Sequence, residues 1–222
     1  MQIHIESLIA AAIILLISFP VHEAAHAWAA YKLGDGTAKL FGRLTLNPIV
    51  HFDPLGGLLL LISTLTTGFG IGWAKPTPVN PSNLRGGHDS EGIVAFAGPA
   101  SNFVLAAIGG VIFRIVYASW DGNLGFVESV LKVLAAFVLI NVALLLFNLV
   151  PVPPLDGSKV LYSMMSPRQV MQWRPTLDQY GFLLLIVVAF VPILPGGQTI
   201  FGFIFDRLGF PVVNLLLGQS LY

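Results

Sequence analysis

One apolar stretch near the start of the chain limits what this sequence can fold into. Residues Ile5–Tyr31 are almost uninterruptedly apolar, and a helix of that length measures about 40 Å, enough to span a bilayer with some tilt. Its second half carries three ionisable side chains, His22, Glu23 and His26. Ionisable groups inside a membrane-length helix are costly, so they indicate a functional site. The sequence therefore predicts a transmembrane helix that carries chemistry.

The composition agrees with a membrane protein. Of the 222 residues, 55% are hydrophobic and 10% are charged, and the mean hydropathy is +0.82, whereas a soluble domain carries about 25% charged residues. The formal net charge is zero, so no basic face suggests a nucleic-acid partner. The chain has no cysteine, which excludes disulfides and thiolate metal ligands. The length suits one domain, residues 1–222, embedded in a lipid bilayer.

The ionisable side chains form the pattern His-Glu-x-x-His. On a helix, His22 and His26 are four residues apart and share one face, so both imidazoles can bind one zinc ion. Glu23 lies beside the first histidine, where a carboxylate can take a proton from a zinc-activated water. Because Pro20 lacks an amide hydrogen, we expect a kink or a local opening of the helix just before the motif.

Four further apolar stretches determine the expected fold. They are Gly92–Trp120, Ser129–Val150, Leu177–Leu194 and Gln198–Leu217. The first three are expected to span the bilayer, and the last is expected to be either a further span or an interfacial helix. We therefore predict an all-α polytopic membrane protein. Its three-helix core should lie within about residues 5–165, with one or two further transmembrane helices within residues 177–220.

A catalytic zinc ion usually has three protein ligands and one open position, and the motif supplies two of them. The next histidine along the chain is His51, so the third ligand must come from another segment. The candidates are His51, Asp53, His88, Glu91 and Asp156. Asp156 fits best, because it follows an apolar helix in a proline-rich loop. Such a loop can dip into the membrane where it lines a protein cavity.

A site shared by the motif and Asp156 constrains the topology. The helix ends that carry the ligands must lie on one side of the bilayer, so the connection from Lys32 to Glu91 must begin and end there. Leu55–Gly72 is glycine-rich and short for a span, so we expect it to be re-entrant or to be one half of a two-way crossing, rather than one simple crossing. The prolines within residues 73–81 predict an extended segment after it.

Four short segments carry a resemblance to a known family. Residues 22–26 read His-Glu-x-x-His, and residues 148–157 read Asn-x-x-Pro-x-Pro-x-Leu-Asp-Gly. Residues 98–102 read Gly-Pro-x-x-Asn, and residues 73–80 are similar to an extended segment found in short bacterial members. Together they resemble the site-2 protease family of intramembrane zinc metalloproteases, peptidase family M50, over about residues 10–160.

The resemblance implies one zinc ion per chain, held by His22, His26 and Asp156, with Glu23 as the catalytic base. It implies an intramembrane zinc metalloendopeptidase that hydrolyses peptide bonds in or near transmembrane segments of membrane proteins, as in regulated intramembrane proteolysis. The loops have no room for the PDZ or CBS domain that many members carry, so the chain looks like a minimal member of the family.

A helical substrate hides its peptide bonds in internal hydrogen bonds and must unwind before it is cut. We expect the extended segment to pair with the unwound substrate as an added strand, through the amides of Lys75, Thr77 and Val79. Asn148 is expected to donate to the substrate carbonyl, and Asn102 is a second candidate for a substrate contact. Each asparagine can instead bond between helices, as is common in membrane bundles.

The expected partners are a transmembrane substrate and the lipid bilayer. Lys and Arg occur in both loops near the site and are absent from residues 121–128, which indicates a site toward the cytoplasm of a multi-pass protein in a prokaryotic inner membrane. Two other classes of function remain open. A zinc-binding membrane transporter or sensor would not need Glu23, and a non-catalytic partner protein would not need zinc.

Overall fold

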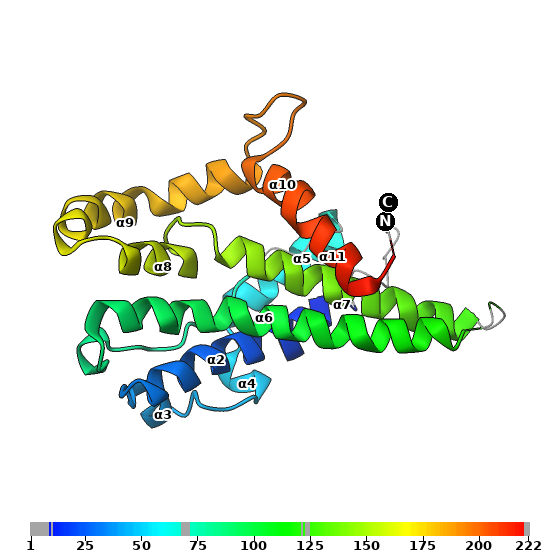
Figure 1. Cartoon of the computed structure of the whole chain (residues 1–222), viewed down its shortest axis with the longest axis horizontal. Coiled ribbons are helices and arrows are strands. Elements are labelled where there is room, and N and C mark those ends of the chain that lie inside the picture. The colour runs from blue at the N-terminus through cyan, green and yellow to red at the C-terminus, as the bar shows by residue number, and fades with distance from the viewer. Residues whose placement is uncertain (1–8, 10, 68–71, 121, 123–124, 220–222) are drawn as a thin grey trace.

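The computed structural model of the chain describes residues 9, 11–67, 72–120, 122 and 125–219 (Figure 1). These residues form helices joined by turns and extended connections, and none of them belongs to a β-sheet. Four of the described helices are long and apolar enough to cross a membrane: Ala11–Lys32, Gly87–Ala118, Gly125–Asn148 and Ile200–Leu217. The predicted all-α polytopic fold is confirmed.

The first long helix opens just before the motif. Ile14–Ser18 form a π-helical turn, η1, which continues directly into α2, Phe19–Lys32. Pro20 has no amide hydrogen, and its ring would clash with the carbonyl of Leu16 in a regular α-helix. The wider π turn relieves that clash. The expected local opening at Pro20 is therefore confirmed.

The described residues of the connection after α2 do not include a full crossing. They form three short α-helices, α3 (Thr37–Leu40), α4 (Pro48–His51) and α5 (Pro54–Thr67), and a 3-10 turn, η2 (Pro81–Asn83). The longest of them, α5, has 14 residues. That is about 21 Å of helix, which is shorter than the roughly 30 Å hydrocarbon core of a bilayer.

The chain comes back along α5 rather than continuing away from it. A Cβ placed on Gly72 would lie 2.5 Å from the carbonyl oxygen of Gly56 and 2.6 Å from Cβ of Leu60, so Gly72 packs against the first half of this helix. Soon afterwards the amide of Lys75 donates to the carbonyl of His51, at 2.8 Å. The chain thus returns to the place where α5 begins, beside the end of α4, in agreement with the re-entrant course that the sequence predicts.

Asp35 joins the two ends of this connection by hydrogen bonds. Its carboxylate is fully buried and accepts hydrogen bonds from the amide and hydroxyl of Thr37, the amide of Asn80 and the side chain of Asn83. Burial alone would raise the pKa of Asp35, but these hydrogen bonds outweigh it and hold the pKa below its usual value. The extended segment, residues 72–80, therefore ends beside the C-terminus of α2, where the connection began.

Two long antiparallel helices form the centre of the fold (Figure 1). They are α6 (Gly87–Ala118) and α7 (Gly125–Asn148), and both begin several residues before the predicted spans. α6 also packs against α2 and against the short helix α8 (Asp156–Met164), so it contacts both elements that carry the expected ligands. The packing of α6 on α7 is close, since a Cβ on Gly109 would lie 2.7 Å from the ring of Phe137.

The predicted span at Leu177–Leu194 is wrong. The helix in this region, α9 (Pro167–Phe190), begins much earlier, because Ser166 and Gln169 form a capping box at its start. Its first half is polar, and the apolar part from Gly181 onward measures only about 15 Å. By length and composition α9 does not qualify as a membrane span.

The C-terminal helix is the fourth candidate span instead. It is continuous through α10 (Ile200–Ile204), a π-helical turn η3 (Phe205–Gly209) and α11 (Phe210–Leu217). Its length and composition favour a span over an interfacial helix. In Figure 1 the chain runs from left to right through α9 and again through α10 and α11, so the loop at residues 191–199 does not reverse its direction.

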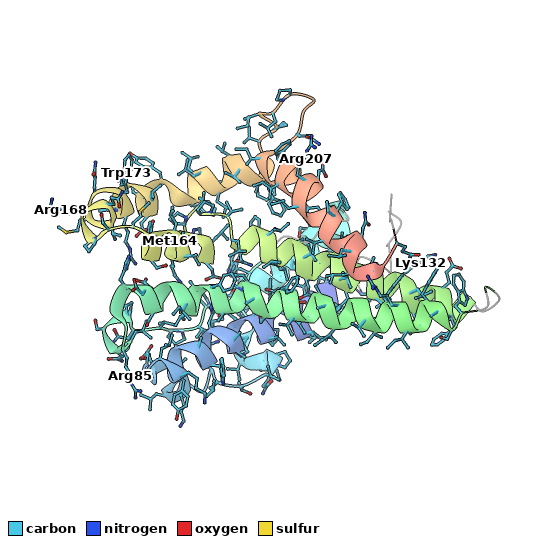
Figure 2. The ribbon with its side chains drawn as sticks, viewed as in Figure 1. Arg85, Lys132, Met164, Arg168, Trp173 and Arg207 are labelled. Carbon is cyan, nitrogen blue, oxygen red and sulfur yellow. The ribbon has the colours of Figure 1, made fainter. Side chains whose placement is uncertain are left out.

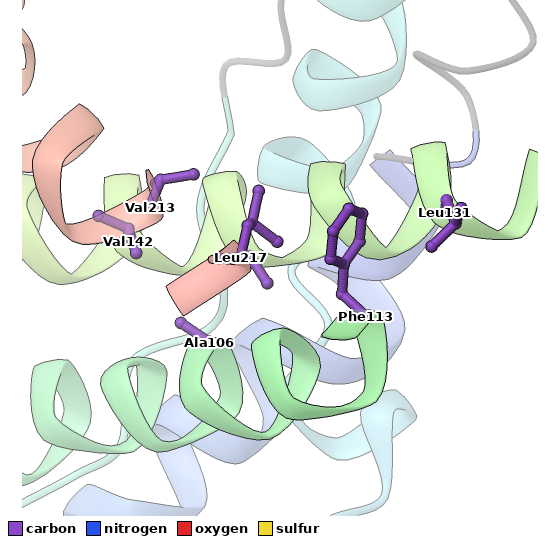
Figure 3. Packing of buried hydrophobic residues seen from close by; sticks show 7 residues of the cluster. Ala106, Phe113, Leu131, Val142, Val213 and Leu217 are labelled. Atoms are coloured by element: carbon purple, nitrogen blue, oxygen red, sulfur yellow. The ribbon is translucent and has the colours of Figure 1, made fainter. Parts of the chain in front are cut away.

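One apolar cluster holds α11 against α6 and α7 (Figure 3). Its buried members are Ala106, Phe113, Leu131, Val138, Val142, Val213 and Leu217. At the end of α11, Arg114 of α6 donates from Nε to the carbonyl of Leu216, at 2.8 Å, and from Nη2 to the carbonyl of Leu215. The last carbonyls of a helix have no partner within it, and a cation there satisfies them. Arg114 thus joins α6 to α11.

Labelled basic side chains lie toward both ends of the long axis of the molecule, and Arg207 lies between them (Figure 2). Arg85 and Arg168 lie at the end where α2 stops and α6 begins, and Lys132 lies toward the opposite end.

Candidate metal centre

Three side chains from two elements meet at one point. His22 and His26 lie one turn apart on α2, and Asp156 is the first residue of α8. His22 Nε2 lies 3.1 Å from His26 Nε2, and Asp156 Oδ2 lies 3.1 Å from the first nitrogen and 3.2 Å from the second. Among the described residues, these three form the group of His, Asp or Glu side chains that can hold a metal ion. Each histidine is only 7% exposed.

Each histidine presents the lone pair of its Nε2 to this point. His26 Nδ1 lies 2.8 Å from the carbonyl oxygen of Val94, which can only accept, so the proton is on Nδ1. His22 Nδ1 lies 2.6 Å from Oδ1 of Asn102 and donates to it in the same way. A neutral histidine that is protonated at Nδ1 keeps Nε2 free to bind a metal.

Three electron-pair donors therefore face one another, namely two imidazole nitrogens and one carboxylate oxygen. Such groups repel unless a cation lies between them. Zinc binds nitrogen and oxygen at about 2.0–2.1 Å in tetrahedral geometry, which separates the ligand atoms by roughly 3.3–3.4 Å. The separations here, 3.1–3.2 Å, are close to that value. The residues therefore fit a zinc ion with three protein ligands and an open fourth position.

Gly98 of α6 leaves room beside the ligand atoms. A Cβ at this position would lie 2.6 Å from His22 Nε2 and closer still to His26 Nε2. Real Cβ atoms do not approach other atoms to less than 3.0 Å, so any side chain here would fill the space next to the ligand nitrogens. The backbone of α6 thus forms one wall of the metal centre.

The loop between α7 and α8 brings Asp156 to the histidines. Gly157 packs against the residues that follow α7, since a Cβ on it would lie 2.5 Å from the carbonyl oxygen of Val150. The hydroxyl of Ser158 donates to the carbonyl of Leu155 at 2.7 Å, which links the first turn of α8 to the end of the loop. The small residue at 157 therefore allows the tight turn that places the carboxylate.

Glu23 is half-buried and is held by the extended segment. The amide of Thr77 donates to Oε2 of Glu23 at 2.8 Å, and the hydroxyl of Thr77 donates to the carbonyl oxygen of Glu23 at 3.0 Å. Two hydrogen bonds from one residue therefore fix both the side chain and the backbone at this position. The re-entrant connection thus contacts the motif directly.

Two of the three amides expected to bind substrate already donate hydrogen bonds inside the chain. Lys75 donates to His51, and Thr77 donates to Glu23. Val79 is half-buried and packs against a small apolar cluster whose buried members are Ala29, Ala30, Leu84 and Val94. A substrate strand that used the first two donors would have to displace these contacts. The role of these residues toward a substrate stays a prediction.

The two asparagines expected near the substrate have partners of their own. Asn102 is fully buried, accepts from His22 and donates through Nδ2 to Oδ1 of Asn141, at 3.0 Å. Its carboxamide is therefore used behind the metal centre. Asn148 is half-buried near the C-terminus of α7 and donates to the carbonyl of Leu144 in its own helix, at 3.0 Å. A substrate contact at Asn148 stays a prediction.

The other four candidates for the third ligand are engaged elsewhere. His51 and His88 each bond to a backbone carbonyl oxygen. Asp53 accepts from two amides at the start of α5 and so caps that helix. Glu91 forms an ion pair with Arg174 of α9, with 3.4 Å between Oε1 and Nη2. Asp156 is thus the candidate that lies beside the two histidines of the motif.

Val94, Gly98 and Asn141 shape the site but were not predicted as site residues. Val94 contributes only its backbone carbonyl, which every residue type supplies, so no sequence signal marks it. Gly98 opens the Gly-Pro-x-x-Asn segment, and Asn141 is a polar residue in a strongly apolar helix. These two positions therefore carried a signal that could have identified them.

Comparisons with known proteins agree with this site. A sequence profile of peptidase family M50 matches residues 112–192, which include Asp156. YwhC of Bacillus subtilis (strain 168), named as a candidate zinc metalloprotease, is 38% identical over 82% of this chain and 80% of YwhC. Rip2 of Mycolicibacterium smegmatis and Rip2 of Mycobacterium tuberculosis (H37Rv), named in the same way, are 31% and 27% identical.

The match to the smegmatis Rip2 covers 81% of this chain and 66% of that protein, and the match to the tuberculosis Rip2 covers 82% and 66%. No solved structure matches this chain. The extent of the similarity to YwhC, the family profile and the convergence of two histidines and an aspartate lead to the same assignment. This chain is an integral membrane protein that belongs to peptidase family M50, and its metal is zinc.

Proposed function

We propose that this chain is an intramembrane zinc metalloendopeptidase, which hydrolyses peptide bonds in or near the transmembrane segments of membrane proteins. One observation carries the proposal. His22, His26 and Asp156 converge at one point, Glu23 directly follows His22 in the sequence, and the histidines belong to a helix long and apolar enough to span a membrane. A metal centre within such a helix suits the cleavage of substrates that are themselves embedded in lipid.

The chemistry divides between the metal and the chain. Zinc, when bound by the two histidines and Asp156, supplies Lewis-acid activation of water and of the scissile carbonyl. Glu23 takes a proton from the attacking water, whose oxygen bonds to the carbonyl carbon, and returns a proton to the amine as the C–N bond breaks. The amide of Thr77 holds Oε2 of Glu23, so we assign proton transfer to the second oxygen, Oε1.

The substrate in this proposal unwinds beside the extended segment, residues 72–80. That segment contacts α2 at Glu23, so a peptide lying along it is close to the base. We propose that Val79 contacts the unwound backbone, that Lys75 does so once its amide exchanges the carbonyl of His51 for one of the substrate, and that Asn148 donates to a substrate carbonyl. Thr77 acts on the substrate through Glu23, because its amide is already bonded to that side chain.

We further propose that residues 1–222 act as one membrane-embedded domain whose site faces the cytoplasm of a prokaryotic cell. Arg85 and Arg168 lie at the end of the molecule where α2 stops (Figure 2). Arginine and lysine favour the cytoplasmic side of a membrane. The named relatives are bacterial proteins, which supports a bacterial inner membrane.

Metal analysis and a cleavage assay test the proposal together. Purified wild type should hold one zinc ion per chain and cut a model transmembrane peptide in proteoliposomes. His22→Ala and Asp156→Ala should lose both zinc and cleavage. Glu23→Gln should keep its zinc and lose cleavage by about 10²–10⁴-fold, because it removes only the proton transfer. Full cleavage by Glu23→Gln would refute the assignment of the base.

Two other functions predict different results in the same experiment. A zinc transporter or sensor would keep its activity in Glu23→Gln and lose it in His22→Ala. A non-catalytic partner protein would contain no zinc in the wild type. Zinc in the wild type, together with cleavage that depends on Glu23, excludes both.

A further inference from the structure

Behind the metal centre, a chain of buried hydrogen bonds joins three helices. His22 on α2 donates from Nδ1 to Oδ1 of Asn102 on α6, at 2.6 Å. Asn102 donates from Nδ2 to Oδ1 of Asn141 on α7, at 3.0 Å. Asn141 donates from Nδ2 to the carbonyl oxygen of Phe137, one turn earlier on α7, at 2.9 Å. Both asparagines are 0% exposed, so bulk water does not compete for these bonds.

The carbonyl of Phe137 determines which group donates and which accepts in each hydrogen bond of this network. The carbonyl of Phe137 can only accept, so Asn141 must turn its Nδ2 toward it. Oδ1 of Asn141 then faces Asn102, which must present its own Nδ2. This arrangement leaves Oδ1 of Asn102 for His22, so His22 must carry its proton on Nδ1. One backbone carbonyl on α7 therefore selects the tautomer of a metal ligand on α2.

We propose that Asn141 is a positioning residue for zinc. Acting through Asn102, it holds His22 as the Nδ1-protonated tautomer and keeps the Nε2 lone pair turned toward the metal. The inference rests on the metal centre of the proposed function and adds to it a residue that touches neither metal nor substrate. The tautomer of His26 does not depend on these asparagines, because its Nδ1 donates directly to the carbonyl of Val94.

Removing Asn141 allows the order of donors and acceptors to reverse. Leucine at this position leaves Nδ2 of Asn102 facing an apolar group, and an unpaired buried donor is costly. The carboxamide can then rotate and direct Nδ2 at His22, which moves the imidazole proton to Nε2. A proton on Nε2 occupies the lone pair that zinc needs.

Aspartate is the variant that keeps the order intact. It has the shape of asparagine, and burial in this dry site disfavours its charged form, so the carboxyl is protonated. It can then donate its proton to the carbonyl of Phe137 and accept from Asn102. Asn141→Asp keeps the donor and the acceptor, whereas Asn141→Leu keeps only a side chain of similar size. Comparing the two variants therefore shows whether the hydrogen bonds matter or only the volume of the side chain.

Zinc affinity of the full-length protein in detergent micelles, measured by competition with a chelating dye, tests the proposal. Asn141→Leu should bind zinc about 10–100-fold more weakly than wild type, the usual loss when the partner of a metal-binding histidine is removed. Asn141→Asp should bind zinc as the wild type does. Val138→Ala is the matched control, because Val138 is also 0% exposed on α7 but is apolar, so it should lose stability and keep its affinity.

The ¹⁵N imidazole spectrum of the metal-free protein gives an independent reading. Wild type and Asn141→Asp should carry the His22 proton on Nδ1, and Asn141→Leu should carry it on Nε2. Equal affinity of wild type and Asn141→Leu would overturn the proposal, as would an equal loss in Asn141→Asp or in Val138→Ala. Both experiments measure binding alone. A chain that binds zinc as described but cuts no peptide would refute the proposed function and leave this inference standing.

Discussion

The backbone amide of Thr77 donates a 2.8 Å hydrogen bond to Oε2 of Glu23. The two neighbours of Thr77, Pro76 and Pro78, have no amide hydrogen. Of these three consecutive residues, only Thr77 is able to hold the carboxylate in this way. The re-entrant connection therefore orients the carboxylate of the residue that we propose as the base.

Thr77→Pro removes this donor and frees the carboxylate of Glu23. We expect cleavage of a model transmembrane peptide to fall at least about 10-fold, toward the roughly 10²-fold loss of a missing general base, with the zinc content unchanged. Thr77→Val is the control, because it keeps the amide and loses only the hydroxyl bond to the carbonyl of Glu23. It should cut at close to the wild-type rate. A proline variant as fast as wild type would contradict the link.

Gly98→Ala should abolish zinc binding, because its Cβ would lie against Nε2 of both ligand histidines. Gly109→Ala is a matched control on the same helix, since its Cβ would meet the ring of Phe137 instead. It should lower the thermal unfolding midpoint and keep the zinc. Elemental analysis of both purified variants decides the point, and a fully loaded Gly98→Ala protein would show that the space beside the histidines is not needed.

Asp35 should make the stability of the fold depend on pH. Its folded pKa lies below the unfolded value of about 3.9, so its contribution is present above that pH and is lost as pH falls through the folded pKa. Asp35→Asn should lower stability at neutral pH by about 1–3 kcal/mol, because it removes the negative charge and replaces one of the two acceptor oxygens that serve the four donors with an NH2 group. Its unfolding midpoint should change less than that of wild type in acid.

Thermal unfolding in detergent at neutral pH and at about pH 3 measures this difference. Asp89→Asn is the control, because Asp89 is an exposed acid at the start of α6. If Asp89→Asn and Asp35→Asn destabilise the protein equally, the buried hydrogen bonds of Asp35 are not the cause.

Arg114→Met should loosen the C-terminal helix. The variant keeps an apolar side chain of similar length but loses the donors to the carbonyls of Leu215 and Leu216. A hydrogen bond to a charged group contributes about 1.5–3 kcal/mol, so the unfolding midpoint should fall. Arg207→Met, at an exposed arginine of η3, should leave the midpoint almost unchanged. Equal midpoints for the two variants would show that Arg114 does not stabilise the packing of α11.

The sequence was sufficient to predict the convergence of His22, His26 and Asp156. Helical spacing places the histidines on one face, and the matched motif around Asp156 placed the third side chain. The orientation of Asn102 was not predictable in the same way. It depends on the side-chain partners that α6 meets on α2 and α7, and a single sequence does not contain that packing. The sequence pattern of a buried asparagine in an apolar helix is equally compatible with a substrate contact and with a hydrogen bond between helices.

The wrong span at Leu177–Leu194 has a different cause. Hydropathy located the apolar half of α9 but not the place where the helix begins. Ser166, Pro167 and Gln169 are a helix-start signal that lies well before the apolar residues, so the helix is polar where it begins and its apolar part is too short to cross. The residues that cap the helix, rather than its hydrophobicity, determine where α9 begins.

The hydrogen bonds at the base of the re-entrant connection affect how this fold is able to evolve. Asp35 binds Asn80, and the amide of Arg85 donates to the carbonyl of Leu33 at 2.9 Å, so the returning end is anchored to α2. The position of Thr77 is therefore independent of how many residues precede Gly72. Lengthening a closed loop costs only about 0.6 kcal/mol for each doubling. The connection can therefore lengthen in evolution without moving Thr77 away from Glu23.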